Sequence, residues 1–234
     1  MNENKDLYAE LKKNTVDSKN QLKDSQSVKF HCTENDGIRV MFVGNSITLH
    51  GVSPTIGWNI ECGMAASDVE NDYVHRLEKM ILEKKPDATF CVCQVAAWER
   101  KYKEEGDEKL RLYTSARDFC ADIIVLRLVE NCPRTDIDGE TFRRELMRLA
   151  KFLDGGKKAK FIVTTSFWHH PLDPDIVKFA EENNIPLVEL GDLGEMKEMK
   201  AIGLFEHNGV ANHPGDLGMK TIAQRIFEPL KELL

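Results

Sequence analysis

The sequence predicts an α/β protein, a three-layer α/β/α sandwich around a parallel sheet of about five strands. Short apolar runs alternate along the chain with helical stretches of about ten to twenty residues, which is the pattern of βαβ units. Such units place helices on both faces of a parallel sheet. The 234 residues suffice for one core, and no repeat or low-complexity linker divides them. We therefore expect a single domain over residues 29–234.

The expected strands are apolar runs bounded by polar or glycine-containing segments. They cover 38–43, 88–95, 122–128, 160–166 and 186–190. The first run stops at Gly44-Asn45-Ser46, which indicates a tight turn at the carboxyl end of a buried strand. Ser46 is then expected at the sheet edge where open α/β proteins bind ligands. The alternative is that Ser46 only caps the next helix.

Capping residues, glycines and a proline mark where the expected helices begin and end. Ser67 and Glu70 have the spacing of a capping box, and the helix that follows them must end before Pro86. Gly155 and Gly156 end another helix. The helical segments are 67–85, 98–120 in two pieces around Gly106, 142–153, 174–183 and 216–232.

The first 28 residues are polar and charged, without proline or glycine. Leu7 and Leu11 are spaced for one helical face, so both a short helix and a frayed arm are open. The first residues lack the apolar core of a signal peptide, which favours a cytoplasmic location. No apolar run approaches the roughly 18 to 20 residues that cross a bilayer, so no membrane partner is expected.

Composition narrows the classes of partner and cofactor. The net charge of −7 and the lack of a basic stripe argue against nucleic-acid binding. The six cysteines show no paired C-x-x-C spacing, which predicts reduced and mostly buried thiols. His169 and His170 follow a predicted strand without carboxylates at ligand spacing, so no metal site is predicted there. The oligomeric state is left open.

Four polar stretches fall on the same predicted sheet edge, and together they fit acyl transfer. They are Ser46, 63–67, Glu130-Asn131 and 208–216. A serine hydroxyl such as that of Ser46 needs a base within hydrogen-bond reach, which His213 supplies. The tetrahedral intermediate needs donors for its oxyanion. The N–H groups of Ser46 and Gly63 and the side-chain amide of Asn131 are the candidates. This chemistry requires no cofactor.

These residues give the chain a family resemblance. Ser46 in Gly-Asn-Ser-Ile-Thr, Gly63, Asn131 and His213 match, in order and spacing, the four residues that name the SGNH (GDSL-type) hydrolases. The segments 63–67, 166–168 and 213–219 resemble a branch of bacterial esterases that includes carbohydrate acetylesterases. The resemblance runs from about residue 38 to the end. It implies a flavodoxin-like SGNH hydrolase fold and a serine esterase that removes a small acyl group, such as acetyl on a sugar, through an acyl-enzyme on Ser46.

The chain departs from the family at one position. Members usually place an aspartate three residues before the catalytic histidine, and Val210 stands there. Glu206, Asp192 or a backbone carbonyl are the candidates for orienting His213. His207 is a second possible base, but only His213 stands directly before Pro214 at the start of a helix, as in the family pattern.

Two other functions stay open. A lysophospholipase or thioesterase would need a broad apolar groove, and the 49–62 loop holds only a few large apolar residues. A binding protein that has lost turnover is the alternative from another class, with Val210 in its favour. The expected partner is a small acylated molecule.

Overall fold

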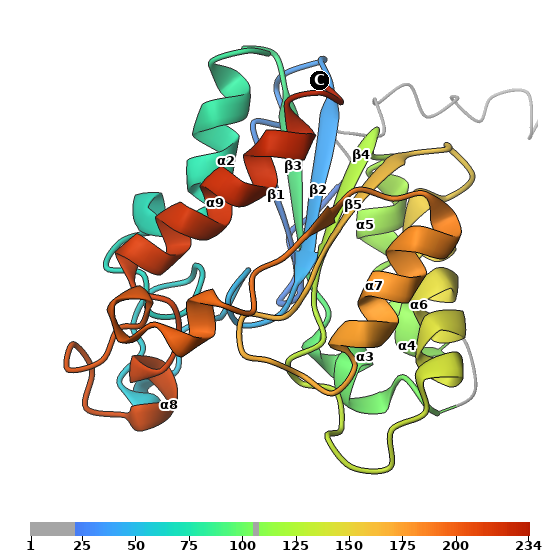
Figure 1. The fold of residues 1–234 in the computed structure, drawn as a ribbon. Helices are drawn as coiled ribbons and strands as arrows, with labels where there is room; N and C mark the ends of the chain where they lie inside the picture. The colour runs from blue at the N-terminus through green and yellow to red at the C-terminus, as the bar shows by residue number, and fades with distance from the viewer. Residues whose placement is uncertain (1–21, 105–107) are drawn as a thin grey trace, which may run out of the picture.

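The computed structural model describes residues 22–104 and 108–234, which form three layers around one sheet (Figure 1). Five strands pair in parallel, and β1 pairs antiparallel with β3 at one edge. The order across the sheet is β1-β3-β2-β4-β5-β6. The strands are β1 (Val28–His31), β2 (Arg39–Gly44), β3 (Thr89–Gln94), β4 (Ile123–Arg127), β5 (Lys160–Thr164) and β6 (Leu187–Val188). The predicted α/β/α fold with a parallel sheet is confirmed.

Strand β1 adds to the five strands that the sequence predicts. Only Val28 of its four residues is fully buried, so the segment has no apolar run that would have marked it as a strand. Such an edge strand pairs on one side only and can carry polar residues. Val28, which the sequence analysis assigned to the arm, is therefore the first residue of β1. Residues 1–21, where a short helix or frayed arm was expected, lie outside the described residues.

Alternate residues of the central strands face opposite layers. In β2, Val40 and Phe42 belong to one apolar core and Met41 and Val43 to the other, as the twofold side-chain period requires. The first core packs under α2 (Tyr73–Leu82) and α9 (Asp216–Leu230), which lie side by side (Figure 1). The opposite layer consists of α3 (Ala96–Lys101), α4 (Glu108–Arg111), α5 (Thr114–Asp118), α6 (Gly139–Asp154) and α7 (Asp173–Asn183).

The helix boundaries differ from the predicted ones at the start of α2. Asp72 caps this helix, accepting a hydrogen bond from the His75 N–H at 2.8 Å. Ser67 donates instead to Asp216, from its N–H at 2.8 Å and from its hydroxyl at 2.5 Å. The predicted capping box of Ser67 and Glu70 is therefore wrong, because Ser67 joins two distant segments rather than starting a helix.

The remaining short helices lie in the connections. They are η2 (Pro54–Ile56), η3 (Val69–Asn71), η4 (Leu193–Glu195), η5 (Lys197–Met199) and α8 (Asn208–Ala211). The predicted helical segment 98–120 becomes the short helices α3, α4 and α5 in the described residues, and Gly106 lies outside them. Gly155 ends α6 with a left-handed φ of 57°, as predicted.

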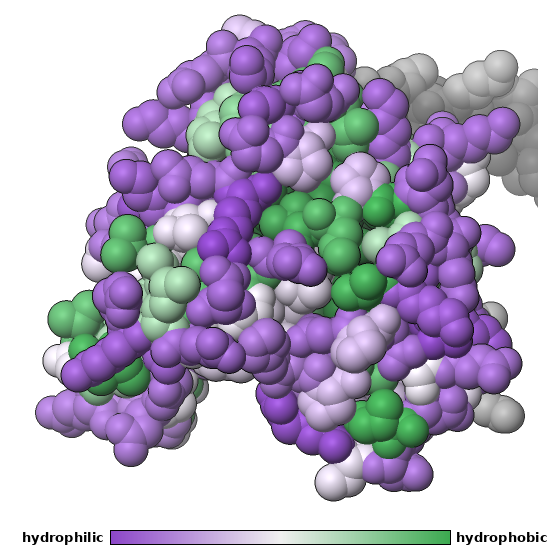
Figure 2. Space-filling model, viewed as in Figure 1, coloured by the Kyte–Doolittle hydropathy of each residue, from purple (hydrophilic) through white to green (hydrophobic). Residues whose placement is uncertain are grey.

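One face of the molecule is mostly hydrophilic (Figure 2), and the cysteines, all of them among the described residues, form no disulfide. Figure 2 shows hydrophilic residues over most of one face, with hydrophobic residues gathered between α9 and α7. None of the helices in residues 22–104 and 108–234 combines the length and apolar character that a membrane span needs. All six cysteines are free thiols, and the buried ones are Cys62, Cys91, Cys93 and Cys132.

Candidate active site

Ser46 sits in the turn that follows β2, at the carboxyl edge of the sheet. The turn closes through hydrogen bonds from the Thr48 and Leu49 N–H groups to the Asn45 carbonyl, both at 2.9 Å. Gly44 is needed there, because a Cβ would lie 1.9 Å from Thr48 Oγ1. Close packing against Thr48 therefore explains the glycine before the nucleophile turn.

His213 contacts Ser46 as the sequence predicts. Ser46 Oγ and His213 Nε2 lie 2.8 Å apart. The other ring nitrogen, Nδ1, lies 2.7 Å from the Gly209 carbonyl. Since a carbonyl only accepts, Nδ1 carries the proton and Nε2 is left to accept from the serine hydroxyl. This is the tautomer that a general base requires.

The position of His213 depends on its neighbours in the loop after α8. Its N–H donates to the Val210 carbonyl at 2.9 Å, and its carbonyl accepts from Ala201 at 2.9 Å. The Trp168 ring meets the imidazole edge to face, with centroids 5.0 Å apart. Burial lowers the pKa of His213 to about 4, although the bond to Gly209 opposes the shift. The imidazole is therefore neutral at neutral pH.

The group on Nδ1 of His213 is a backbone carbonyl and not a carboxylate. Asp192 is held by Arg225 through two hydrogen bonds of 2.5 and 2.7 Å. Glu206 is exposed, and Val210 at the usual acid position is buried in the core. His207 caps α8 by accepting from the Val210 N–H at 3.3 Å, so it serves the backbone of the loop. Of the candidates that the sequence left open, the carbonyl of Gly209 is the one in contact.

The three expected oxyanion donors differ in whether another group in the protein already accepts their hydrogen. The Ser46 N–H makes no hydrogen bond to any residue in the described part of the chain. The Gly63 N–H, in contrast, donates to Asp72 Oδ2 at 2.9 Å, so it is not free as the sequence analysis expected. A Cβ on Gly63 would lie 2.5 Å from the Ile47 carbonyl. Close packing against the nucleophile turn is thus one reason for this glycine.

The loop that carries Gly63 is also tied directly to the nucleophile. The Met64 N–H donates to the Ser46 carbonyl at 2.8 Å. The next residue, Ala65, has a left-handed φ of 75°, which is uncommon for a residue other than glycine. This loop is therefore held in a fixed, partly strained course beside Ser46.

Asn131 follows β4 and is held by a buried carboxylate. Its Nδ2 donates to Glu99 Oε2 at 2.7 Å, which leaves the second hydrogen of the same amide for another acceptor. The other oxygen of Glu99 accepts from Asn45 Nδ2 at 2.9 Å and from the Val129 N–H. Glu99 therefore holds both the oxyanion candidate and the residue before the nucleophile.

A buried ion pair continues this network beneath the nucleophile turn. Arg127 is fully buried and donates to Glu130 Oε1 at 2.6 Å and to Asn45 Oδ1 at 2.5 Å. Burial, followed by repulsion from Glu130, raises the pKa of Glu99. Burial acts in the same direction on Glu130, but the Arg127 guanidinium outweighs it and holds the pKa of Glu130 below its usual value. The pKa of Glu99 is thus raised and the pKa of Glu130 is lowered.

Sequence reasoning missed Glu99 and Arg127. A detectable signal existed for Arg127, because it is a charge inside an apolar strand run and must find a buried partner. Glu99 lies in a charged stretch where nothing distinguishes a buried carboxylate from a solvated one. The histidine pair lies to one side of this network: the buried His170 faces the Cys132 carbonyl at 3.2 Å, and His169 faces Glu195 at 3.2 Å.

Comparison with solved structures identifies the fold. The chain is similar to a two-domain esterase active on acetylated mannans, with a TM-score of 0.52 and 15% identity over 84% of this chain and 49% of that one. It is similar to an acetyl xylan esterase at 0.50 and 17%, over 82% and 99% of the two chains. A GDSL-like lipase from Parabacteroides merdae ATCC 43184 gives 0.52 and 16%, over 82% and 94%. The chain therefore has the fold of the SGNH (GDSL-type) hydrolases.

The matches are to solved structures, and they cover different shares of the neighbouring chains. The chain spans about half the length of the two-domain esterase, 49%. No protein-family model matches the sequence, and no curated protein matches it. The solved structures confirm the fold that the resemblance at Ser46, Gly63, Asn131 and His213 implied.

Proposed function

We propose that the protein is a serine hydrolase that removes a small acyl group from an oxygen ester through an acyl-enzyme on Ser46. The observation that carries this proposal is the 2.8 Å contact between Ser46 Oγ and His213 Nε2, with Nδ1 bound to the Gly209 carbonyl. Nucleophile, base and orienting group stand in the order that acyl transfer needs. The fold supports the same class, since its solved neighbours include esterases.

In the first half-reaction, Ser46 Oγ attacks the ester carbonyl carbon while His213 Nε2 takes the hydroxyl proton. The resulting imidazolium has the Gly209 carbonyl and not a carboxylate at Nδ1, so its charge is stabilised by a dipole alone at that position. The negative charge of Glu130 favours the imidazolium at longer range. His213 then gives the proton to the leaving alkoxide, and the acyl group stays on Ser46.

The oxyanion is proposed to accept from the Ser46 N–H and from the Asn131 side-chain amide. The Ser46 N–H is unused within the described residues, and Asn131 keeps one amide hydrogen beyond its bond to Glu99. Gly63 can contribute only if its N–H leaves Asp72, which costs about 1.5 to 3 kcal/mol for a hydrogen bond to a charged group. The structure thus favours two donors over the three that the sequence analysis expected.

The second half-reaction repeats these roles with water. His213 takes a proton from the water that attacks the acyl carbon, and Ser46 leaves as the hydroxyl when His213 returns the proton. The low pKa of His213 keeps it ready as a base, but it also makes the imidazolium less stable and a stronger acid toward the leaving group.

An acetyl group on a carbohydrate is the proposed substrate class. Two solved neighbours with this fold are described by such activity, one on acetylated mannans and one as an acetyl xylan esterase. Leu49 and Trp58, two of the large apolar residues in the loop after Ser46, are buried in the core. Ile56 and Ile60 are partly buried against that core and Val52 is exposed, so few apolar side chains remain to line a groove for a long acyl chain.

The test is hydrolysis of p-nitrophenyl esters of increasing chain length by the native protein and by Ser46→Ala. We expect the acetate to be turned over best and the Ser46→Ala variant to be inactive. A preference for long acyl chains would favour a lysophospholipase or thioesterase. No turnover by a folded native protein would favour a binding protein.

A further inference from the structure

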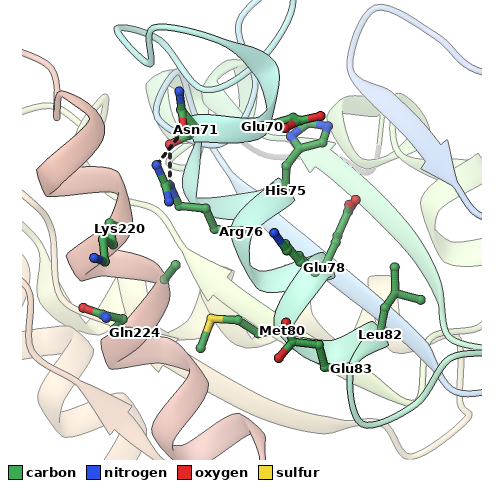
Figure 3. Close-up of a pocket in the computed structure, with 12 residues that line it drawn as sticks. Glu70, Asn71, His75, Arg76, Glu78, Met80, Leu82, Glu83, Lys220 and Gln224 are labelled. Carbon is green, nitrogen blue, oxygen red and sulfur yellow. Dashed lines mark hydrogen bonds between the residues drawn. The ribbon is translucent and has the colours of Figure 1, made fainter.

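A second cluster of functional side chains lies beside the start of α2, apart from the Ser46–His213 pair. His31 is the last residue of β1, and His75 and Glu78 are three positions apart on α2. One ligand atom from each of the three lies within 4.8 Å of the others. Figure 3 shows His75 and Glu78 on the same side of α2, at the wall of a pocket.

The three side chains already contact one another or a supporting carboxylate. His31 Nδ1 lies 2.7 Å from Glu78 Oε1, and the two imidazole rings have centroids 5.1 Å apart. His75 Nδ1 lies 2.9 Å from Oδ1 of Asp72, which is completely buried. Asp72 accepts from the N–H groups of Gly63 and His75 as well. Glu78 therefore holds His31 at one end of the cluster, and Asp72 holds His75 at the other.

The bond to Asp72 fixes which nitrogen of His75 can bind a ligand. Asp72 receives two backbone N–H donors and so acts as a carboxylate, which requires the proton on His75 Nδ1. The lone pair on Nε2 is then free. A carboxylate on the far nitrogen of a histidine is the usual outer-shell partner of a metal-binding imidazole.

The surroundings fit a cation. His31 and His75 line a cavity of about 220 Å³ together with Asp72, Glu61 and Asp24, whereas Glu78 and His75 line the separate pocket of Figure 3, so His75 borders both. The one ammonium among the residues that line the cavity, that of Lys29, lies 3.0 Å from Glu61, so its charge is offset. The side chains of His31 and His75 are 29% and 26% exposed, so both imidazoles are reachable from solvent, and Glu78 lies behind them at 9%.

We propose that His31, His75 and Glu78 bind a divalent transition-metal ion, with Zn²⁺ the best match to the donor set and Asp72 orienting His75. Two imidazoles and one carboxylate are a common zinc set, and such a set leaves a fourth position open to water or a ligand. Thiolates are not part of the site. Among the described residues, the ligand atoms that lie within 4.8 Å of one another come from His31, His75 and Glu78, and neither Cys62, which lines the same cavity, nor Cys32 belongs to that group.

The site has a structural link to the catalytic loop. Asp72 Oδ1 holds His75, and Asp72 Oδ2 holds the Gly63 N–H beside the nucleophile turn. A bound ion that fixes His75 would therefore also fix Asp72 and the loop on it. This consequence does not depend on whether Ser46 hydrolyses esters.

The experiment is calorimetric titration of the chelator-treated full chain with Zn²⁺, alone and in variants. We expect one equivalent to bind, and His75→Gln or Glu78→Gln to weaken binding by at least roughly tenfold, since even outer-shell partners are worth 10- to 100-fold. His169→Gln and Glu83→Gln, one histidine and one carboxylate outside the cluster, serve as matched controls and should bind as the native protein does. Circular dichroism and Tm without metal show that each variant is folded.

Two results would overturn the proposal. The first is a folded native protein that binds no Zn²⁺, or folded His75 and Glu78 variants with native affinity. The second comes from Co²⁺ titrated in place of Zn²⁺, for which nitrogen and oxygen ligands predict a spectrum without thiolate-to-metal charge transfer. A thiolate band that disappears in Cys32→Ser or Cys62→Ser would assign the metal to cysteine.

Discussion

Replacing Glu99 by glutamine should impair catalysis although Glu99 is not expected to touch the substrate. Three N–H donors face this carboxylate, from Asn45, Val129 and Asn131. A glutamine offers one acceptor oxygen and one amide nitrogen, so at least one of the three donors then meets another donor. If Asn131 turns its amide to avoid this, its Nδ2 moves away from the oxyanion.

The magnitude follows from the groups involved. Loss of one oxyanion donor costs on the order of 3 kcal/mol of barrier, or about 10²- to 10³-fold in kcat. The unmatched buried donor costs a further 1 to 3 kcal/mol or so of unfolding free energy. We therefore expect Glu99→Gln to lose roughly 10²-fold in kcat on p-nitrophenyl acetate, with little change in KM, and to unfold at lower urea. Glu181→Gln, an exposed carboxylate on α7, is the control.

A double-mutant cycle tests the route of the effect. If Glu99 acts through Asn131, the Glu99→Gln substitution should cost little more once Asn131→Ala is present. Native kcat in a folded Glu99→Gln variant would refute the reasoning. Additive losses in the double variant would show that Glu99 acts on another group.

Three further predictions concern the nucleophile loop and the base. His213 must be neutral to act and its pKa is lowered to about 4, so kcat/KM should stay level as the pH falls below 6.5 and drop only near pH 4; a midpoint near 6.5 in the pH profile would contradict this. Gly63→Ala should destabilise the fold by about 1 to 3 kcal/mol in urea unfolding, because its Cβ would lie 2.5 Å from the Ile47 carbonyl; native stability would show that the loop yields freely. Asp192→Asn should keep the native kcat/KM and pH profile, since Asp192 is paired with Arg225 and not with His213; a large loss would restore it as the orienting acid.

The fold was predictable because the central strands are continuous apolar runs, a pattern that only burial on both faces explains. Ser46 could be placed from the sequence for the same reason, since parallel strands end at one edge. His213 follows α8 and was selected through the family resemblance. The edge strand β1 was not predictable, because Lys29 and His31 make it look like a polar connection. Its burial depends on pairing with β3, which is a tertiary effect.

The details of the site depended on contacts between distant segments. The group on His213 Nδ1 is a carbonyl that any residue at position 209 would carry, so no side chain marks it. The occupied N–H of Gly63 depends on Asp72, nine positions later and across a turn. Glu99 reaches Asn131 only because α3 lies beside the segment that follows β4. Composition and spacing contain none of this information.

The most direct test of the central claim is covalent labelling with a serine-reactive fluorophosphonate, followed by mass spectrometry of the digested protein. A Ser46 activated by His213 predicts one adduct, on the peptide that contains Ser46, and strongly reduced labelling in Ser46→Ala and His213→Ala. An unlabelled native protein, or an adduct on another residue, would contradict the assignment of Ser46 as the nucleophile.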